Sequence, residues 1–204
     1  MLASRQLTAW NALELLPTTN FRDWNMRRIL AVLFTLAVAM AAGCSTTKGG
    51  SLAERSAAQA EAGWLVLTMV DAMRWDWQFK LADKLRYSPY SYVQQRMLTK
   101  ASMKPFDKGR ASAELTDVYA ERFTAPQLSL LRQIYSSGGM TAAAAGVIPE
   151  RARSSSMAAA LRAAGLTDAN INEATSIFMQ YWDERVDEAL KEIQAAEQSI
   201  VSGY

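Results

Sequence analysis

The sequence predicts an all-α protein, an irregular helical bundle of about five to six helices. Apolar residues after position 50 recur at steps of three and four, the period of one helix face. Residues that favour helix starts and ends separate these runs, and no segment shows the two-residue alternation of a half-buried strand. These three observations favour helices packed on helices around a shared core.

The composition limits the chemistry of the chain. Its 204 residues include no histidine and one cysteine, which excludes histidine-based catalysis, Cys/His zinc sites and internal disulfides. The formal net charge is +2, and residues 1–43 account for it with four arginines against two acidic residues. The rest is therefore neutral and gives no support for nucleic-acid binding. We expect no cofactor, no metal and no enzymatic activity.

Residues 26–44 have the order of an export signal. Arg27 and Arg28 form a positive start, and an apolar run from Ile29 to Met40 follows. A run of about a dozen residues suits a signal peptide and is too short to span a bilayer comfortably. The alternatives are a short membrane anchor, or an ordinary signal peptide cut after a small residue.

Small residues then lead to Gly43 and Cys44. This pattern resembles the bacterial lipobox, although Ala41 stands where leucine is commonest. The resemblance implies a lipoprotein signal peptide over 26–43, cleavage between Gly43 and Cys44, and acyl chains on Cys44. Several chains anchor a protein stably where one does so marginally. The resemblance also implies, from Ser45 after the cysteine, an outer-membrane location, with the inner membrane less favoured.

The flanking segments complete the expected organisation. We interpret residues 1–25 as an upstream extension that precedes the true start at Met26; the alternative is an unusually long positive region of the signal peptide. Residues 44–51 are small, polar and Gly-containing, which predicts a lipidated flexible tether. Residues 52–204 form the predicted helical domain.

The first predicted helix covers residues 52–87 and ends at Ser88-Pro89, because proline disfavours helical geometry in the residue before it. Its apolar stripe consists of Val66, Met69, Val70, Met73, Trp77 and Leu81. A second helix is expected over 90–100, with Tyr90, Val93 and Met97 on one side. A basic loop over 100–110 and a third helix over 111–122 follow.

Capping signals predict the remaining helices. Thr124 with Pro126 in the first turn opens a helix that stops at 138–139, before an alanine-rich stretch. The next helix is expected over 151–164, ended by Gly165 at C′ and Leu166 at C″. The last begins at Thr167 or Asp168 and reaches about Ile200.

Aromatic residues concentrate at Trp64, Trp75, Trp77, Phe79, Tyr87, Tyr90 and Tyr92. Such side chains combine a large apolar area with a polar edge, and could line a binding surface for a peptide, lipid or glycan. The alternative is an aromatic seam of the core. Exposure of these residues would favour binding, and complete burial a structural role.

Two runs of charged residues, one basic and one acidic, could bind ligands or simply face solvent. The basic residues of 100–110 could meet anionic head groups, and the acidic residues of the last helix could hold a divalent ion. Arg185 and Lys191 interrupt the acidic run, so we interpret both runs as solvated surface. The last alternative is an enzyme that holds a dicarboxylate, as secreted chorismate mutases do, but the spacing departs from that family. Its candidate residues are Arg74, Lys80, Lys84 and Arg96.

A short pattern in the middle of the chain consists of Tyr119, Phe123-Thr124, Leu128, Leu131, Ile134-Tyr135-Ser136-Ser137 and Pro149-Glu150. It resembles a family of small envelope proteins, the domain of unknown function family 2059. Gly138 and Met140 depart from it, where the family has proline and glycine. The resemblance implies a helical periplasmic domain and supplies no catalytic residue.

We therefore expect a lipid-anchored helical domain on the periplasmic side of the outer membrane. Its expected partners are the membrane, through the acyl chains, and an envelope protein or an amphiphile. A structural or assembly role in the envelope is the alternative.

Overall fold

All regular elements in the part of the chain that the structure describes are helices. The computed structural model describes residues 51–136 and 138–202. Its helices are α3 (Leu52–Arg86), α4 (Tyr92–Met103), α5 (Lys108–Arg122), α6 (Ala125–Tyr135), α7 (Gly139–Ala144), α8 (Glu150–Arg153), α9 (Ser155–Ala163) and α10 (Asp168–Ser202). The predicted all-α bundle is thus confirmed. Cys44 and the segments assigned to 1–25, 26–43 and most of 44–51 lie outside the described residues.

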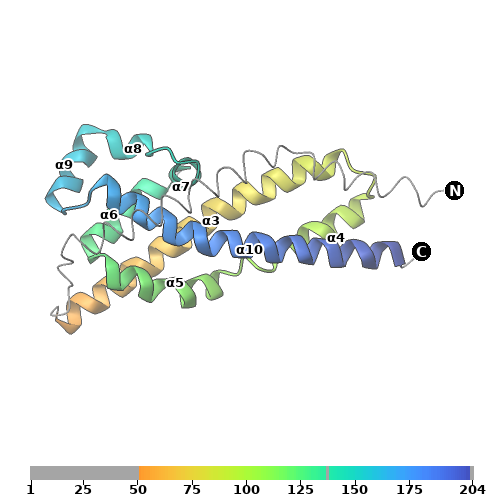
Figure 1. Ribbon diagram of the computed structural model, residues 1–204, viewed down its shortest axis with the longest axis horizontal. Coiled ribbons are helices and arrows are strands. Elements are labelled where there is room, and N and C mark those ends of the chain that lie inside the picture. Colours follow the sequence, from red (N-terminus) through yellow and green to blue (C-terminus); the bar gives the residue numbers. More distant parts are fainter. Residues whose placement is uncertain (1–50, 137, 203–204) are drawn as a thin grey trace. The chain divides into compact units, whose positions relative to one another are not determined.

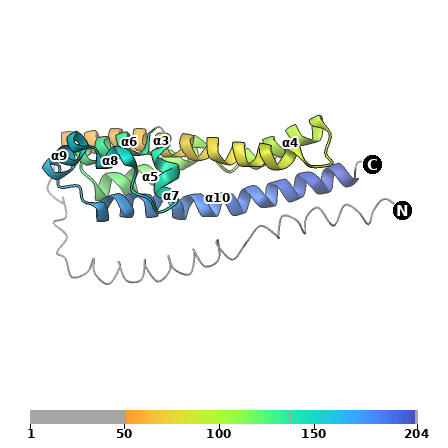
Figure 2. The same cartoon turned by 90° about the horizontal axis from the view of Figure 1, so that it is seen from above.

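The two longest helices, α3 and α10, organise the unit Gly49–Tyr204 (Figures 1 and 2). α5 and α6 pack on α3, while α4 packs against α10 and α3. The bonds from Lys104 to Glu192 and from Tyr90 to Glu197 place α4 and its leading turn beside the C-terminal half of α10. α4 therefore lies far from the short helices α7 to α9 (Figure 1).

The core follows the apolar stripes of these helices. Its largest fully buried side chains include Tyr119, Tyr135, Phe106, Phe178, Leu65 and Met69. The Phe106 ring stacks on Trp182 with centroids 4.2 Å apart, and Trp182 stacks on Phe178 at 6.0 Å. Burying aromatic side chains of this size is a main source of folding free energy.

Side-chain caps set most helix starts. The Ser51 hydroxyl accepts from the Glu54 N–H at 3.3 Å, and the Glu54 carboxylate accepts from the Ser51 N–H at 2.7 Å. This reciprocal pair is a capping box, and Ser91 and Gln94 form another at the start of α4. Each box satisfies two N–H groups that have no partner within their helix.

The predicted stop after α9 is confirmed as a Schellman motif. The Gly165 N–H donates to the Arg162 carbonyl at 3.1 Å, and the Leu166 N–H donates to the Leu161 carbonyl at 2.8 Å. Gly165 has φ +65, which a residue with a side chain rarely adopts.

Three predicted boundaries are wrong. The basic loop expected over 100–110 is limited to 104–107, because Asp107 caps α5 three residues earlier than the apolar pattern suggests. The single helix expected over 151–164 is two helices. Ser154 is extended at their junction, with ψ 144, and its hydroxyl accepts from the Met157 N–H.

The expected end of α6 at 138–139 is also wrong. α6 ends at Tyr135, and Gly138 adopts φ +82 as the residue that precedes α7. The two glycines therefore start the next short helix instead of ending the previous one.

Candidate functional site

Most of the aromatic residues singled out from the sequence are exposed. The exposed fractions are 58% for Trp64, 75% for Trp75, 75% for Phe79, 79% for Tyr87 and 73% for Tyr92. They are therefore not an aromatic core seam. Large exposed apolar patches are uncommon on soluble monomers and mark interaction sites.

Trp77 and Tyr90 lie apart from the exposed group. The Trp77 ring packs against Phe106 with centroids 5.4 Å apart, and its indole N–H is buried without a hydrogen-bond partner in the described residues. The Tyr90 hydroxyl donates to the Glu197 carboxylate at 2.7 Å. Partial burial and this hydrogen bond raise the pKa of Tyr90 to about 12. These two side chains hold helices together.

Three of the exposed aromatic residues follow one face of α3. Phe79 lies four residues after Trp75, and Trp75 lies eleven after Trp64, which at 100° per residue places all three within a narrow stripe. The buried residues of α3, such as Leu65, Met69 and Met73, lie outside this stripe. α3 therefore has a core face and a separate aromatic face.

A groove of about 600 Å³ adjoins this stripe on α4. It is lined by apolar and basic side chains, including Tyr92, Val93, Arg96, Met97 and Lys100 of α4 and Gln78 of α3. Gln78 comes three residues after Trp75 and is its neighbour on the helix surface, so the groove continues into the stripe. We name Trp75, Phe79, Tyr92, Val93 and Met97 the α3–α4 face.

The orientation of α4 was not foreseen from the sequence. Val93 is 65% exposed and Met97 is 47% exposed, whereas Leu98, Ala101 and Ser102 make the buried side. The three-residue spacing of Leu98 and Ala101 could have indicated the buried side of α4. The larger apolar residues Val93 and Met97 made the opposite side look equally suited to burial.

Three cations of the segment that carries the α3–α4 face have no acidic partner among the described residues. Arg86, Arg96 and Lys100 form no ion pair within the described ranges, and the Arg96 guanidinium lies 6.0 Å from the centre of the Tyr92 ring. Three basic residues of the sequence-predicted loop are paired instead: Lys104 with Glu192, Lys108 with Asp71, and Arg110 with Glu114 and Glu188. Arg86 on α3 and Arg96 and Lys100 on α4 are therefore available to a negative ligand at this face.

The local charge also favours a negative ligand. Residues 72–104 carry seven basic and two acidic side chains, a net charge of +5. Partial burial, and then the neighbouring charge of Lys80, hold the pKa of Lys84 below its usual value.

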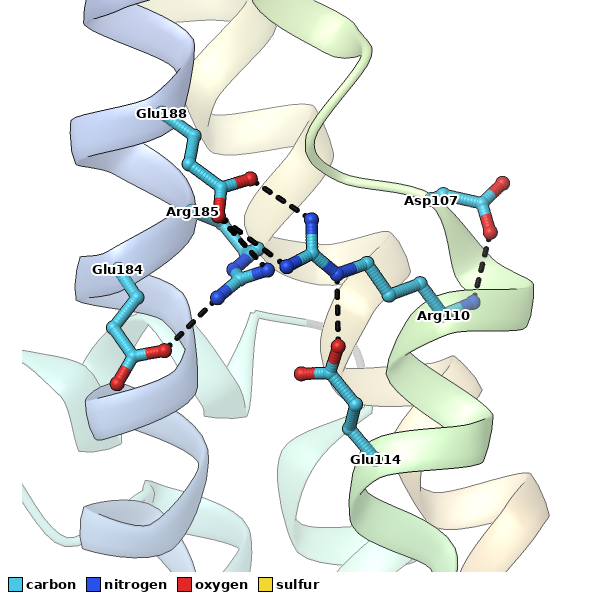
Figure 3. Close-up of polar contacts among 6 residues, drawn as sticks. All are labelled: Asp107, Arg110, Glu114, Glu184, Arg185 and Glu188. Carbon is cyan, nitrogen blue, oxygen red and sulfur yellow. Dashed lines mark hydrogen bonds and ion pairs between the residues drawn. The ribbon is translucent and has the colours of Figure 1, made fainter.

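A second polar cluster joins α5 to α10 (Figure 3). Arg110 donates to Glu114 at 2.8 Å and to Glu188 at 2.9 Å. Arg185, whose side chain is 5% exposed, contacts Glu188 at 3.1 Å and Glu184 at 2.9 Å. Glu188 lies between the two guanidinium groups, so the cluster crosslinks the helices.

This cluster offers little for catalysis. The hydrogen bond from Arg110 to Glu114 is the main cause that raises the pKa of Arg110, so its guanidinium stays charged. Each of the three glutamates already accepts from an arginine. The arrangement leaves no side chain poised as a base or a nucleophile.

The other sequence-derived sites do not come together. Of Arg74, Lys80, Lys84 and Arg96, only Arg96 lines the groove, and Lys80 pairs with Asp76 at 2.6 Å. Within residues 51–136 and 138–202 no group of three potential ligands is placed to hold a metal ion. In the same ranges no helix has both the length and the apolar character to cross a bilayer. Gly43 and Cys44 lie outside the described residues.

Comparison with known proteins adds no relative. No protein-family model matches the chain, and neither the curated proteins nor the solved structures contain a significant match.

Proposed function

We propose that this chain is a lipid-anchored lipoprotein whose helical domain binds an amphiphile or an envelope protein on the periplasmic side of the outer membrane. The observation that carries the binding role is the exposure of the α3–α4 face. The same domain buries Phe106, Phe178 and Trp182 almost completely, so it has the capacity to bury aromatic side chains. Leaving Trp75 and Phe79 in solvent is therefore a specific feature of that surface.

The chemistry of the groove favours an amphiphile. Tyr92, Val93 and Met97 present apolar surface, while Arg96 and Lys100 supply charge at its edge. A ligand with a hydrocarbon part and a negative head would satisfy both. Small-molecule and lipid sites combine an apolar wall with a few polar groups in the same way.

The anchor is supported by the lipobox-like order that ends at Cys44. A thiol that carries a diacylglyceryl group cannot form a stray intermolecular disulfide, which explains a lone cysteine in an exported protein. Acyl chains would keep the binding domain close to the bilayer. The alternative of a purely structural envelope component leaves the exposed aromatic residues without a role.

Replacing the anchor residue tests the location. Cys44→Ala in the full chain is expected to abolish lipidation and to remove the protein from the outer-membrane fraction, because no thiol remains to accept the acyl group. Membrane fractionation with immunodetection measures this. Thr46→Ala is the matched control and should fractionate as the chain without any substitution does. Unchanged outer-membrane fractionation of Cys44→Ala would contradict the anchor.

A further inference from the structure

We infer that the α3–α4 face lies on the surface of an anionic phospholipid bilayer, as a second membrane attachment of the folded domain. This inference rests on the proposed function, which brings the domain to a membrane. It goes further by naming the occupant of the face. It also implies that α3 lies along the bilayer plane, because Trp64, Trp75 and Phe79 follow one stripe of that helix.

The apolar side chains have the chemistry of a membrane interface. Trp75, Phe79 and Tyr92 are each about three-quarters exposed. Tryptophan and tyrosine are enriched at the level of the lipid head groups, where an apolar ring and a polar edge are both satisfied. Met97 and Val93 line the adjoining groove and add aliphatic surface. Side chains of this kind insert into the boundary between head groups and acyl chains without crossing the bilayer.

The cations are arranged to meet phosphate groups. Arg86, Arg96 and Lys100 have no carboxylate partner within the described ranges, so no internal ion pair must break before they bind a head group. Their long stems let the charge reach phosphates while the chain covers apolar surface. The net charge of +5 over residues 72–104 attracts an anionic leaflet.

Ion pairing distinguishes the cations of the α3–α4 face from the carboxylates of α10. α10 carries eight acidic and two basic residues, a net charge of −6, but Glu173, Glu188 and Glu192 pair with Arg122, Arg110 and Lys104 of neighbouring helices. These paired carboxylates are thus partly neutralised, whereas Arg86, Arg96 and Lys100 keep their charge available to an anionic surface.

A second copy of the chain is a poorer occupant. The acidic helix α10 would satisfy the cations, but its large exposed apolar residues are limited to Leu190 and Val201 among the described positions. These cannot cover Trp75, Phe79 and Tyr92. A bilayer interface provides negative charge and apolar depth together.

An anchored domain needs only weak affinity for this contact. Acyl chains on Cys44 would confine the domain near the bilayer, so that the second contact forms as an intramolecular event at high effective concentration. The face then fixes how the domain stands on the membrane.

Tryptophan quenching in reconstituted vesicles tests the contact. The full-length protein, as it is purified from membranes, is placed in phosphatidylcholine vesicles with and without phosphatidylglycerol, using lipids brominated on the acyl chains. We expect bromine to quench tryptophan emission more strongly when phosphatidylglycerol is present. Trp75→Phe should lower the quenchable emission by roughly half, because Trp64 and Trp75 are the exposed tryptophans among residues 51–136 and 138–202 and both lie on the stripe expected to enter the interface. Trp182→Phe is the control and should leave the quenchable part unchanged, because Trp182 is buried.

Charge variants provide an independent comparison. Arg96→Gln with Lys100→Gln should abolish the extra quenching in phosphatidylglycerol vesicles, because both side chains border the groove. Lys191→Gln, on the exposed surface of α10, is the matched control and should show the same quenching as the protein without substitutions. Circular dichroism verifies that each variant remains helical.

The possible outcomes separate the two proposals. Equal quenching in the two vesicle types, or unchanged quenching in Arg96→Gln/Lys100→Gln, would overturn the bilayer contact. Lipid-independent shielding of Trp75 together with crosslinked dimers would overturn it in favour of a second copy. A Cys44 without acyl chains would refute the anchor but not the bilayer contact. Quenching that depends on phosphatidylglycerol would still support the contact of the α3–α4 face with the bilayer.

Discussion

At the scale of single residues, two glycines of the bundle differ in whether a Cβ atom would fit. At Gly139, the first residue of α7, a Cβ atom would overlap the carbonyl oxygen of Ile134 and lie 3.6 Å from Pro149. At Gly63, within α3, the nearest atom to an added Cβ is the Thr116 hydroxyl oxygen at 4.0 Å. The first glycine permits close backbone contact, and the second occupies an ordinary helix position.

Alanine at each position is expected to change stability in opposite directions. Gly139→Ala should lower the free energy of unfolding by about 2 kcal/mol or more, because the backbone around Ile134 must move. Gly63→Ala should raise it by up to about 1 kcal/mol, the difference in helix propensity. Urea unfolding followed by circular dichroism measures both. Identical unfolding midpoints for the two variants would contradict this account of the packing.

At the scale of helices, tyrosine hydroxyls of neighbouring helices form hydrogen bonds with the backbone of α10. Tyr119 donates to the Ala174 carbonyl at 2.6 Å, and Tyr135 donates to the Ile171 carbonyl at 2.7 Å. Burial raises the pKa of both residues, and it raises the pKa of Tyr181 to about 12. These contacts need the neutral phenol, because a buried phenolate has lost its proton donor and carries an unsolvated charge.

Alkaline pH is therefore expected to destabilise the bundle. Above pH 10 the tyrosines of the unfolded chain lose protons that the folded chain retains up to about 12 at Tyr90 and Tyr181. The unfolded state then binds fewer protons, so the free energy of unfolding falls as pH rises from 10 to 12 and is fully retained below 10. Urea unfolding at pH 8 to 11 measures the decline, and Tyr90→Phe should lessen it. A free energy of unfolding that does not change up to pH 11 would refute this role of the tyrosines.

The presence of the helices could be predicted from the sequence pattern and its capping residues, but some of their boundaries could not. The stop at Gly165-Leu166 follows from glycine in the left-handed conformation, which is a local property. The break at Ser154 escaped prediction because serine is tolerated within helices, and its role as a cap depends on how α8 and α9 pack. Asp107 likewise started α5 within what looked like a basic loop.

The aromatic residues of the candidate site were identified from the sequence, but their division into surface and core was not. Trp75 and Trp77 differ by two positions and lie on opposite sides of α3, one exposed and one packed on Phe106. Periodicity alone cannot show which side a neighbouring helix covers. Arg96 and Lys100 entered the site only once α4 was seen to turn Met97 outward.

At the scale of the whole molecule, the folded domain separates charge that the sequence totals conceal. The net charge is +5 over residues 72–104 and −6 over α10, whereas residues 44–204 together carry no net charge. Only the fold shows that Trp75, Phe79, Tyr87 and Tyr92 of the positive segment are exposed. A surface of this kind has a clear use in a protein held at a membrane, so the account depends on the anchor.

Mass spectrometry of the N-terminal peptide tests the anchor most directly. The protein is isolated from its native membranes and digested. We predict a mature chain that begins at Cys44 and carries the mass of a diacylglyceryl group on the thiol, with an acyl group on the amine. A chain that begins at another residue, or a Cys44 thiol without added mass, would contradict it.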